Sequence, residues 1–222
     1  MGIDGITNSY ATAIWALDFC LTFKQMGGSR IDFYNTFKPS FQSVFNAPHF
    51  TPNPIHYGLF LSILTFNGLY NMTVQEITGS NTKIKVYDLD RRAVLMINKN
   101  TDPNHTGKVE ISTTKKIHSI TCIYMQAPSM ASTTNVTLGG LYWIGNNSQQ
   151  QGEYTEYFYK KNINNTFMID LNYTQVAYCR YVFLFNNGFE PLKRKKNTNK
   201  ALHLTLSGLY VLMLMMILNW SL

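Results

Sequence analysis

The chain opens with a helix, one strand and a second helix, and no earlier strand precedes them with which that strand could pair. Residues 7–26 form an apolar stretch that begins with good capping residues and ends at Gly27. Apolar residues surround this helix on nearly every side, so we expect cover on several sides. Residues 30–34 indicate a short strand, and residues 54–66 indicate a second helix with proline in its first turn. A single strand cannot form a sheet, which predicts that most of this α/β domain lies on another stretch of polypeptide.

From about residue 71 the hydrophobic period changes from that of a helix to that of a strand. Apolar and polar residues then alternate in short runs, separated by turns rich in Asn, Asp, Pro and Gly. Short strands at this spacing predict an antiparallel β-sandwich, with a domain boundary near residues 67–68. The candidate strands are residues 73–78, 84–88, 93–98, 108–112, 119–126, 154–159, 166–170 and 177–185.

The positive charge of the chain does not indicate a nucleic-acid binder. The formal net charge is +7 over 222 residues, but the run Lys193-Arg194-Lys195-Lys196 supplies four of those charges. No aromatic residues interleave with this run, as a platform for stacking bases would need. A run of this kind is usually a solvated linker or the flank of a membrane segment.

Residues 202–222 form an uncharged apolar segment that is long enough to span a bilayer. The segment is either a tail anchor or the signal for a lipid anchor. The basic run before it favours the cytosolic side. Six Asn-x-Ser/Thr sequons favour the lumenal side instead, although the N-terminus has no secretory signal. These candidate glycosylation sites are Asn71, Asn104, Asn135, Asn146, Asn164 and Asn172.

The three cysteines do not have the spacing of a metal site. Cys20 lies in the apolar first helix and is most simply a small buried hydrophobe. Cys122 and Cys179 lie in strand-like runs and could form a disulfide if the compartment is oxidising. The five histidines are scattered without metal-ligand spacing, and no phosphate-binding loop is present, so we expect no metal and no cofactor.

Four motifs resemble glycoside hydrolase family 79, the family of heparanases and β-glucuronidases. Residues 5–18 (Gly-Ile-Thr-Asn-Ser-Tyr-Ala-Thr-Ala-Ile-Trp-Ala-Leu-Asp) are similar to its stretch Gly-x-Ser-Asp/Asn-Ser/Thr-Phe/Tyr-Ala-x-Ala-x-Trp-x-Leu-Asp. Residues 54–61 (Pro-Ile-His-Tyr-Gly-Leu-Phe-Leu) resemble the helix that closes its barrel. Residues 94–100 resemble a strand that ends in an Asn-rich turn, and residues 136–140 (Val-Thr-Leu-Gly-Gly) a loop of its C-terminal β domain. Together the motifs follow the order of the family up to about residue 190.

The resemblance implies a (β/α)8 barrel with a β-sandwich packed on it. The chain would then be an α+β fragment: the last helix–strand–helix of the barrel, an antiparallel β-sandwich and a C-terminal apolar helix. Barrel active sites lie at the C-terminal ends of the strands. By this rule Tyr34 and Asn35 would contact a sugar, and Gly2 would lie in a loop that reaches the substrate carboxylate.

The catalytic residues implied by the resemblance are missing from this chain. A retaining glycosidase uses two carboxyl groups about 5 Å apart. In the family both come from barrel strands that would precede Met1, and no substitute pair is visible. Asp18 matches the family motif as a helix-packing or hydrogen-bonding residue. We therefore expect no catalytic residue here and no hydrolysis by the chain alone.

Two hypotheses follow for the organisation 1–67 (barrel fragment), 68–190 (sandwich), 191–201 (basic linker) and 202–222 (apolar tail). In the first, the chain is the C-terminal part of a β-glucuronidase- or heparanase-like enzyme for acidic, uronic-acid-containing glycans, and it needs the missing N-terminal barrel portion as a partner. In the second, it is a membrane-tethered, non-catalytic β-sandwich module. The expected location is extracellular or lumenal and membrane-associated through the tail, the alternative being a tail anchor with a cytosolic domain.

Overall fold

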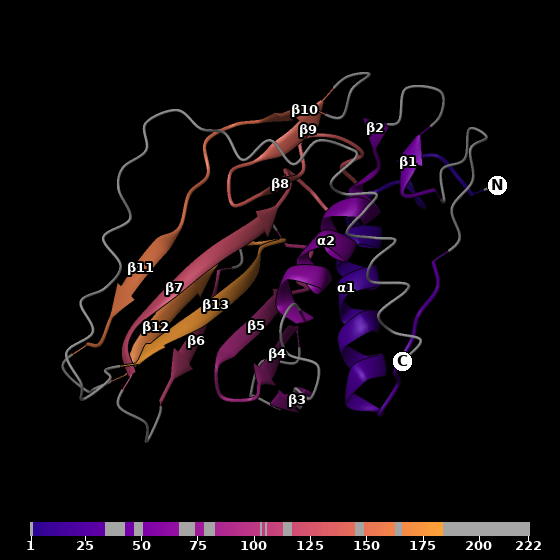
Figure 1. Cartoon of the computed structure of the whole chain (residues 1–222). Helices are drawn as coiled ribbons and strands as arrows, with labels where there is room; N and C mark the ends of the chain where they lie inside the picture. Colours follow the sequence, from indigo (N-terminus) through magenta and orange to yellow (C-terminus); the bar gives the residue numbers. More distant parts are fainter. Residues whose placement is uncertain are drawn as a thin grey trace. The chain divides into compact units, whose positions relative to one another are not determined.

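A seven-stranded antiparallel sheet lies at the centre of the structure (Figure 1). The structure is a computed structural model that describes residues 2–33, 43–46, 51–66, 74–77, 83–102, 104, 106–112, 117–144, 149–162 and 166–183. The strand order is β11–β7–β13–β5–β4–β3, and β8 pairs with β7. The strands are β3 (Val74–Ile77), β4 (Ile84–Leu89), β5 (Ala93–Asn98), β7 (Ile117–Gln126), β8 (Thr137–Leu138), β11 (Tyr157–Lys160) and β13 (Val176–Phe183).

The alternation of apolar and polar residues located most of these strands correctly. β5 covers residues 93–98 as predicted, and the ends of the other predicted strands shift by three residues or fewer within the described ranges. The short strands were missed, because two or three residues are too few to show a period. They are β8, β1 (Phe45–Asn46), β2 (Thr51–Pro52), β9 (Tyr142–Ile144) and β10 (Gln149–Gln151). The predicted α+β class is confirmed, since two helices accompany the sheets.

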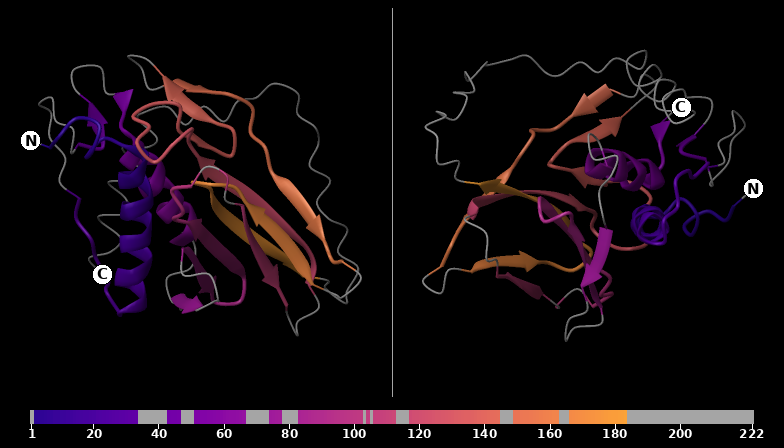
Figure 2. Two further views of the ribbon diagram at one scale, coloured as in Figure 1. Left: turned by 180° about the vertical axis from the view of Figure 1, so that it is seen from behind. Right: turned by 60° about the horizontal axis from the view of Figure 1, so that its bottom comes forward.

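A two-stranded sheet covers one face of the central sheet. It consists of β6 (Gly107–Ile111) and β12 (Phe167–Leu171), which pair antiparallel. Along β12 the residues alternate between buried and exposed, as expected for a strand with one face on a core. This layer lies on the side of the central sheet away from the helices (Figure 2). The core between the two layers includes Ile120, Cys122, Phe167, Ile169 and Leu171.

The helices α1 (Tyr10–Gln25) and α2 (Pro54–Phe66) pack on the opposite face of the central sheet (Figures 1 and 2). The hydroxyl of Tyr10 lies 2.9 Å from the carbonyl oxygen of Met125 and 2.8 Å from that of Thr174, which ties the start of α1 to the sheet. α2 has the predicted bounds. Its Gly58 faces the backbone of Ala13, and a Cβ atom at this position would lie 2.0 Å from the Ala13 carbonyl oxygen. The absence of a side chain at Gly58 therefore permits the close packing of the two helices.

α1 begins at Tyr10, and its N-cap Ser9 makes no side-chain hydrogen bond to the helix; backbone carbonyl groups cap it instead. The amides of Tyr10 and Ala11 donate to the carbonyl oxygens of Ser132 and Met130, at 2.7 and 2.9 Å. These bonds satisfy amides that have no partner within a helix. At the other end Gly27 has φ 86°, which confirms the predicted left-handed turn.

The predicted barrel strand at residues 30–34 is wrong for the part that the structure describes. Residues 30–33 belong to neither helix nor strand. The alternation that suggested a strand has another cause: Ile31 and Phe33 pack against a small core that includes Ala16 and Cys20 of α1. The predicted basic linker and the apolar segment 202–222 lie outside the described residues.

The two faces of α1 differ sharply in exposure. Tyr10, Leu17 and Leu21 are fully buried. On the outer face Trp15 is 55% exposed and Phe19 is 41% exposed, and their rings stack with centroids 5.6 Å apart. A monomeric helix normally places polar residues on its outer face. This outer face is therefore an apolar surface that stays partly exposed, although Phe33 packs against both rings.

Candidate functional site

The predicted sugar-contacting residues stay a prediction, because only Gly2 lies in the described part of the chain. Tyr34 and Asn35 lie outside the described residues. Gly2 is exposed near the chain end, and its φ of 90° is a value that glycine adopts readily. Three predicted glycosylation sites, Asn104, Asn135 and Asn172, are exposed. The other three, Asn71, Asn146 and Asn164, lie outside the described residues.

Cys122 and Cys179 form a disulfide in the structure. They are direct register partners on β7 and β13, with Cα atoms 4.0 Å apart. The bond lies in the core between the central sheet and the β6–β12 layer. Cys20 is buried as a free thiol, and burial raises its pKa to about 11. It is thus a poor nucleophile at neutral pH.

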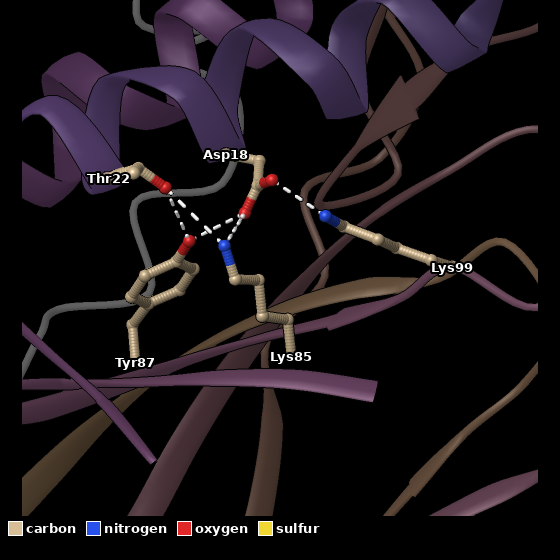
Figure 3. Close-up of polar contacts among 5 residues, drawn as sticks. All are labelled: Asp18, Thr22, Lys85, Tyr87 and Lys99. Carbon is tan, nitrogen blue, oxygen red and sulfur yellow. Dashed lines mark hydrogen bonds and ion pairs between the residues drawn. The ribbon is translucent and has the colours of Figure 1, made fainter. Parts of the chain in front are cut away.

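The most developed polar constellation in the described part of the chain surrounds Asp18 (Figure 3). Asp18 lies on α1, one turn before Thr22, and both side chains point toward the sheet. Lys85 and Tyr87 stand two residues apart on β4, so the pleat places them on one face, toward α1. Lys99 follows directly after β5. We call these five residues the Asp18 cluster.

The carboxylate of Asp18 is held through both of its oxygen atoms. Oδ1 accepts a hydrogen bond from the Tyr87 hydroxyl at 2.6 Å and lies 3.1 Å from Lys85 Nζ. Oδ2 accepts from Lys99 Nζ at 2.6 Å. Since Tyr87 donates its proton to Asp18, Thr22 must donate to Tyr87 across their 3.1 Å contact. Lys85 Nζ also lies 3.4 Å from Thr22 Oγ1.

These contacts keep Asp18 ionised. Burial alone would raise its pKa, but the hydrogen bonds from Lys99 and Tyr87 and the charge of Lys99 together lower it. The pKa of Tyr87 rises to about 12, first through burial and then through its hydrogen bond to Asp18. Burial disfavours the charge of Lys85, yet its contacts with Tyr87 and Asp18 raise its pKa overall. At neutral pH the cluster therefore contains one carboxylate, two ammonium groups and a neutral phenol.

This arrangement fastens α1 to the sheet and is unsuited to glycoside hydrolysis. General acid catalysis would require a carboxyl group that keeps its proton near neutral pH. A retaining mechanism would also require a second carboxyl group nearby. Within the described residues, the Asp18 carboxylate contacts two lysines and a tyrosine. The sequence had indicated a hydrogen-bonding role for Asp18 but not its partners. The alternation Lys85-x-Tyr87 indicates that these two residues share a face of β4, but not that α1 lies over that face.

A second constellation joins α2 to the short strands. The imidazole ring of His56 stacks on Phe60, with centroids 6.0 Å apart, and its centroid lies 5.1 Å from the rings of Phe45 and Trp143. The Tyr57 hydroxyl accepts a hydrogen bond from the Trp143 amide at 3.1 Å. Burial lowers the pKa of His56 to about 4, so this ring is neutral at physiological pH.

The described residues contain neither a metal-binding cluster nor a membrane-spanning helix. No three or more His, Cys, Asp or Glu side chains converge there in a way that could hold a metal ion. Neither described helix has the length and apolar character needed to cross a bilayer.

The fold is similar to part of a known glycosidase. A 4-O-α-L-rhamnosyl-β-D-glucuronidase from Fusarium oxysporum 12S superimposes with a TM-score of 0.70 at 14% sequence identity. The match covers 81% of this chain and 41% of that enzyme, so the chain spans less than half of its length. The chain has a glycoside-hydrolase-like fold.

Two other solved glycosidases are similar to this chain only weakly. A β-xylosidase from Caulobacter crescentus CB15 and a GH51 arabinofuranosidase from Xanthomonas axonopodis pv. citri match with TM-scores of 0.40 and 0.33, at 10% and 9% identity. They cover 82% and 56% of this chain, and 43% and 26% of their own. No protein-family model and no curated protein sequence matches the chain.

Proposed function

We propose that the chain is the C-terminal portion of a family 79-like retaining glycoside hydrolase that acts on uronic-acid-containing glycans, and that it is inactive without the rest of the barrel. The observation that carries this proposal is the fold likeness to a glucuronidase, which covers most of this chain but only 41% of the other. The two catalytic carboxylates would come from the remaining barrel portion, which would be the partner of this chain. Tyr34, Asn35 and Gly2 stay candidates for the sugar-binding residues.

The partly exposed outer face of α1 supports the proposal that a partner is missing. Trp15 and Phe19 form an aromatic surface, and Phe33 lies edge-on to both rings, at 6.5 and 6.4 Å. A contiguous patch of exposed apolar side chains often marks a surface that binds a partner. A neighbouring barrel helix would bury them.

We also propose a secretory route with membrane association through residues 202–222. The Cys122–Cys179 disulfide would persist in an oxidising compartment. The exposed sequons would be accessible there to glycans. Digestion with an N-glycosidase, followed by mass measurement of the protein from its native membrane fraction, tests this part: an unchanged mass contradicts it.

The activity test uses 4-nitrophenyl β-D-glucuronide. The purified chain should give no turnover above buffer, whereas a complex with the polypeptide encoded upstream should hydrolyse the glucuronide. In the complex, the fluorescence of Trp15 should shift to shorter wavelength as the ring leaves water. The matched control is an upstream polypeptide whose proposed nucleophile Glu is replaced by Gln. Turnover by the chain alone would refute the proposed inactivity, and an inactive complex would refute the proposed enzyme.

A second candidate function is a self-contained, non-catalytic binding module. One observation favours it: the inner faces of α1 and α2 share a core with the chain's own sheet, so the described part does not need a barrel to bury them. The sequence of the gene upstream of Met1 separates the two candidates. An in-frame strand that ends in Glu supports the enzyme, and an in-frame stop codon supports the module.

A further inference from the structure

The helices do not extend over the whole of their face of the central sheet. They bury Ile123 and Met125 of β7 and Val176 and Tyr178 of β13. Toward the other end of these strands, two rows of directly opposite residues lie beyond this core. One row is Phe158, Thr121 and Arg180, and the other is Lys160, Ser119 and Val182. Directly opposite residues share one face of a sheet, so both rows face the same side as the helices.

The first row carries an exposed aromatic ring and an ordered ion pair. The side chain of Phe158 is 72% exposed, although its strand is paired with β7. The Arg180 guanidinium donates from Nη2 to Glu156 Oε1 at 2.9 Å, and Tyr154 donates its hydroxyl proton to the same oxygen at 2.6 Å. Glu156 is only 13% exposed and is held by both contacts, whereas half of the Arg180 side chain faces solvent. We call Tyr154, Glu156, Phe158, Lys160 and Arg180 the Phe158 platform.

We propose that the Phe158 platform binds a uronate-containing oligosaccharide. The aromatic ring offers an apolar surface for the C–H face of a pyranose ring. Phe158 and Arg180 are two strand spacings apart, about 10 Å. This separation suits an oligosaccharide, with one sugar unit against the ring and a later unit of the same chain beside the guanidinium.

The charges of the platform favour an acidic sugar. Lys160 and Arg180 carry two positive charges against the single negative charge of Glu156. A guanidinium can bind a carboxylate in a planar, bidentate manner, and Arg180 donates to Glu156 from one of its nitrogen atoms, Nη2. The second oxygen of Glu156 can accept a hydrogen bond from a sugar hydroxyl. The carboxylates of an acidic peptide would be repelled by the negative charge of Glu156. The choice of ligand class rests on the proposed function.

The test measures binding of a hyaluronan hexasaccharide to the full chain by isothermal titration calorimetry. Phe158→Ala should weaken binding about tenfold, since the loss of stacking is the main change at this exposed position. Arg180→Met should weaken it by at least about tenfold and reduce its salt dependence. The matched control is Tyr157→Ala, because Tyr157 is exposed on the same strand but faces the opposite side. It should bind as the unaltered chain does.

Several results would overturn the platform. They are no measurable binding of the hexasaccharide, equal binding by Phe158→Ala, an equal loss in Tyr157→Ala, and equally tight binding of neutral cellohexaose or of a glutamate-rich peptide. The experiment is independent of turnover. A chain that binds through Phe158 but forms no active complex refutes the proposed enzyme alone. An active complex whose binding ignores Phe158 and Arg180 refutes the platform alone.

Discussion

Replacement of Asp18 by Asn should destabilise the described unit by about 2 kcal/mol. The change keeps the shape of the side chain but removes the charge that two lysines share. Hydrogen bonds to charged groups contribute about 1.5–3 kcal/mol each when their partner is lost. Asp18 and Lys85 are 19% and 21% exposed and Lys99 is 39% exposed, so solvent screening reduces the sum. For a chain of this size the loss corresponds to a Tm lower by roughly 4–8 °C.

The two lysines should couple unequally to Asp18. The Lys99 contact is shorter, 2.6 Å against 3.1 Å, but Coulomb's law makes this a difference of only about a fifth. Lys99 is nearly twice as exposed as Lys85, and screening should decide the order. Double-mutant cycles with Lys85→Met and Lys99→Met, followed by urea unfolding, should therefore give the larger coupling energy for Asp18 with Lys85.

The pH dependence gives an independent check. The pKa of Asp18 is lowered in the fold, so its contribution is present above the ordinary aspartate value of 3.8 and is lost as the pH falls through the folded value. The stability difference between the unaltered chain and Asp18→Asn should shrink in that range. The control is Asp32→Asn, which removes an exposed pair with Arg30 and should change stability by less than about 0.5 kcal/mol. If Asp18→Asn changes the stability at pH 7 as little as this control does, the Asp18 cluster does not fasten α1 to the sheet.

Three further predictions concern other parts of the described unit. Gly58→Ala should destabilise it by roughly 1–3 kcal/mol in urea unfolding, because the added methyl group would meet the Ala13 carbonyl, whereas Ser62→Ala on the same helix should cost less. The buried His56 ring should cost the unaltered chain up to about 3 kcal/mol of stability as the pH falls from 6.5 to about 4, the window set by its depressed pKa. His56→Phe should remove this pH dependence, and an unchanged pH profile would contradict the prediction. Replacement of Cys122 and Cys179 by Ala should cost about 4 kcal/mol, the value expected for a closed loop whose ends are 57 residues apart, and equal stability with and without reductant would refute it.

The sequence correctly predicted those elements that depend mainly on their own residues. Pro54 at a first turn and a dense apolar pattern gave the bounds of α2, and a short continuous apolar run bounded by turn residues located β5. The predicted strand at residues 30–34 failed because alternation records only that Ile31 and Phe33 need a core. Packing against Ala16 and Cys20 satisfies that need without a strand.

The Asp18 cluster could not be predicted from the sequence, for a different reason. Its residues lie up to 81 positions apart, and only the packing of α1 on β4 and β5 brings them together. A pattern of alternation predicts which face of β4 Lys85 occupies, but not which helix lies over it. The same holds for the start of α1, whose amides are capped by carbonyls of Met130 and Ser132 rather than by a nearby side chain.

The two faces of α1 connect the stability of the chain with its proposed function. Tyr10 and Asp18 fasten the helix to the sheet by contacts far apart in sequence, so the helix can keep its place without a barrel. Those contacts give no reason for an exposed tryptophan stacked on an exposed phenylalanine, which adds apolar surface in water. If no partner binds the outer face, replacing Trp15 and Phe19 by polar residues should leave the function unchanged. Because inner and outer faces act separately, such a double variant should fold normally and lose only its capacity to join the proposed barrel partner.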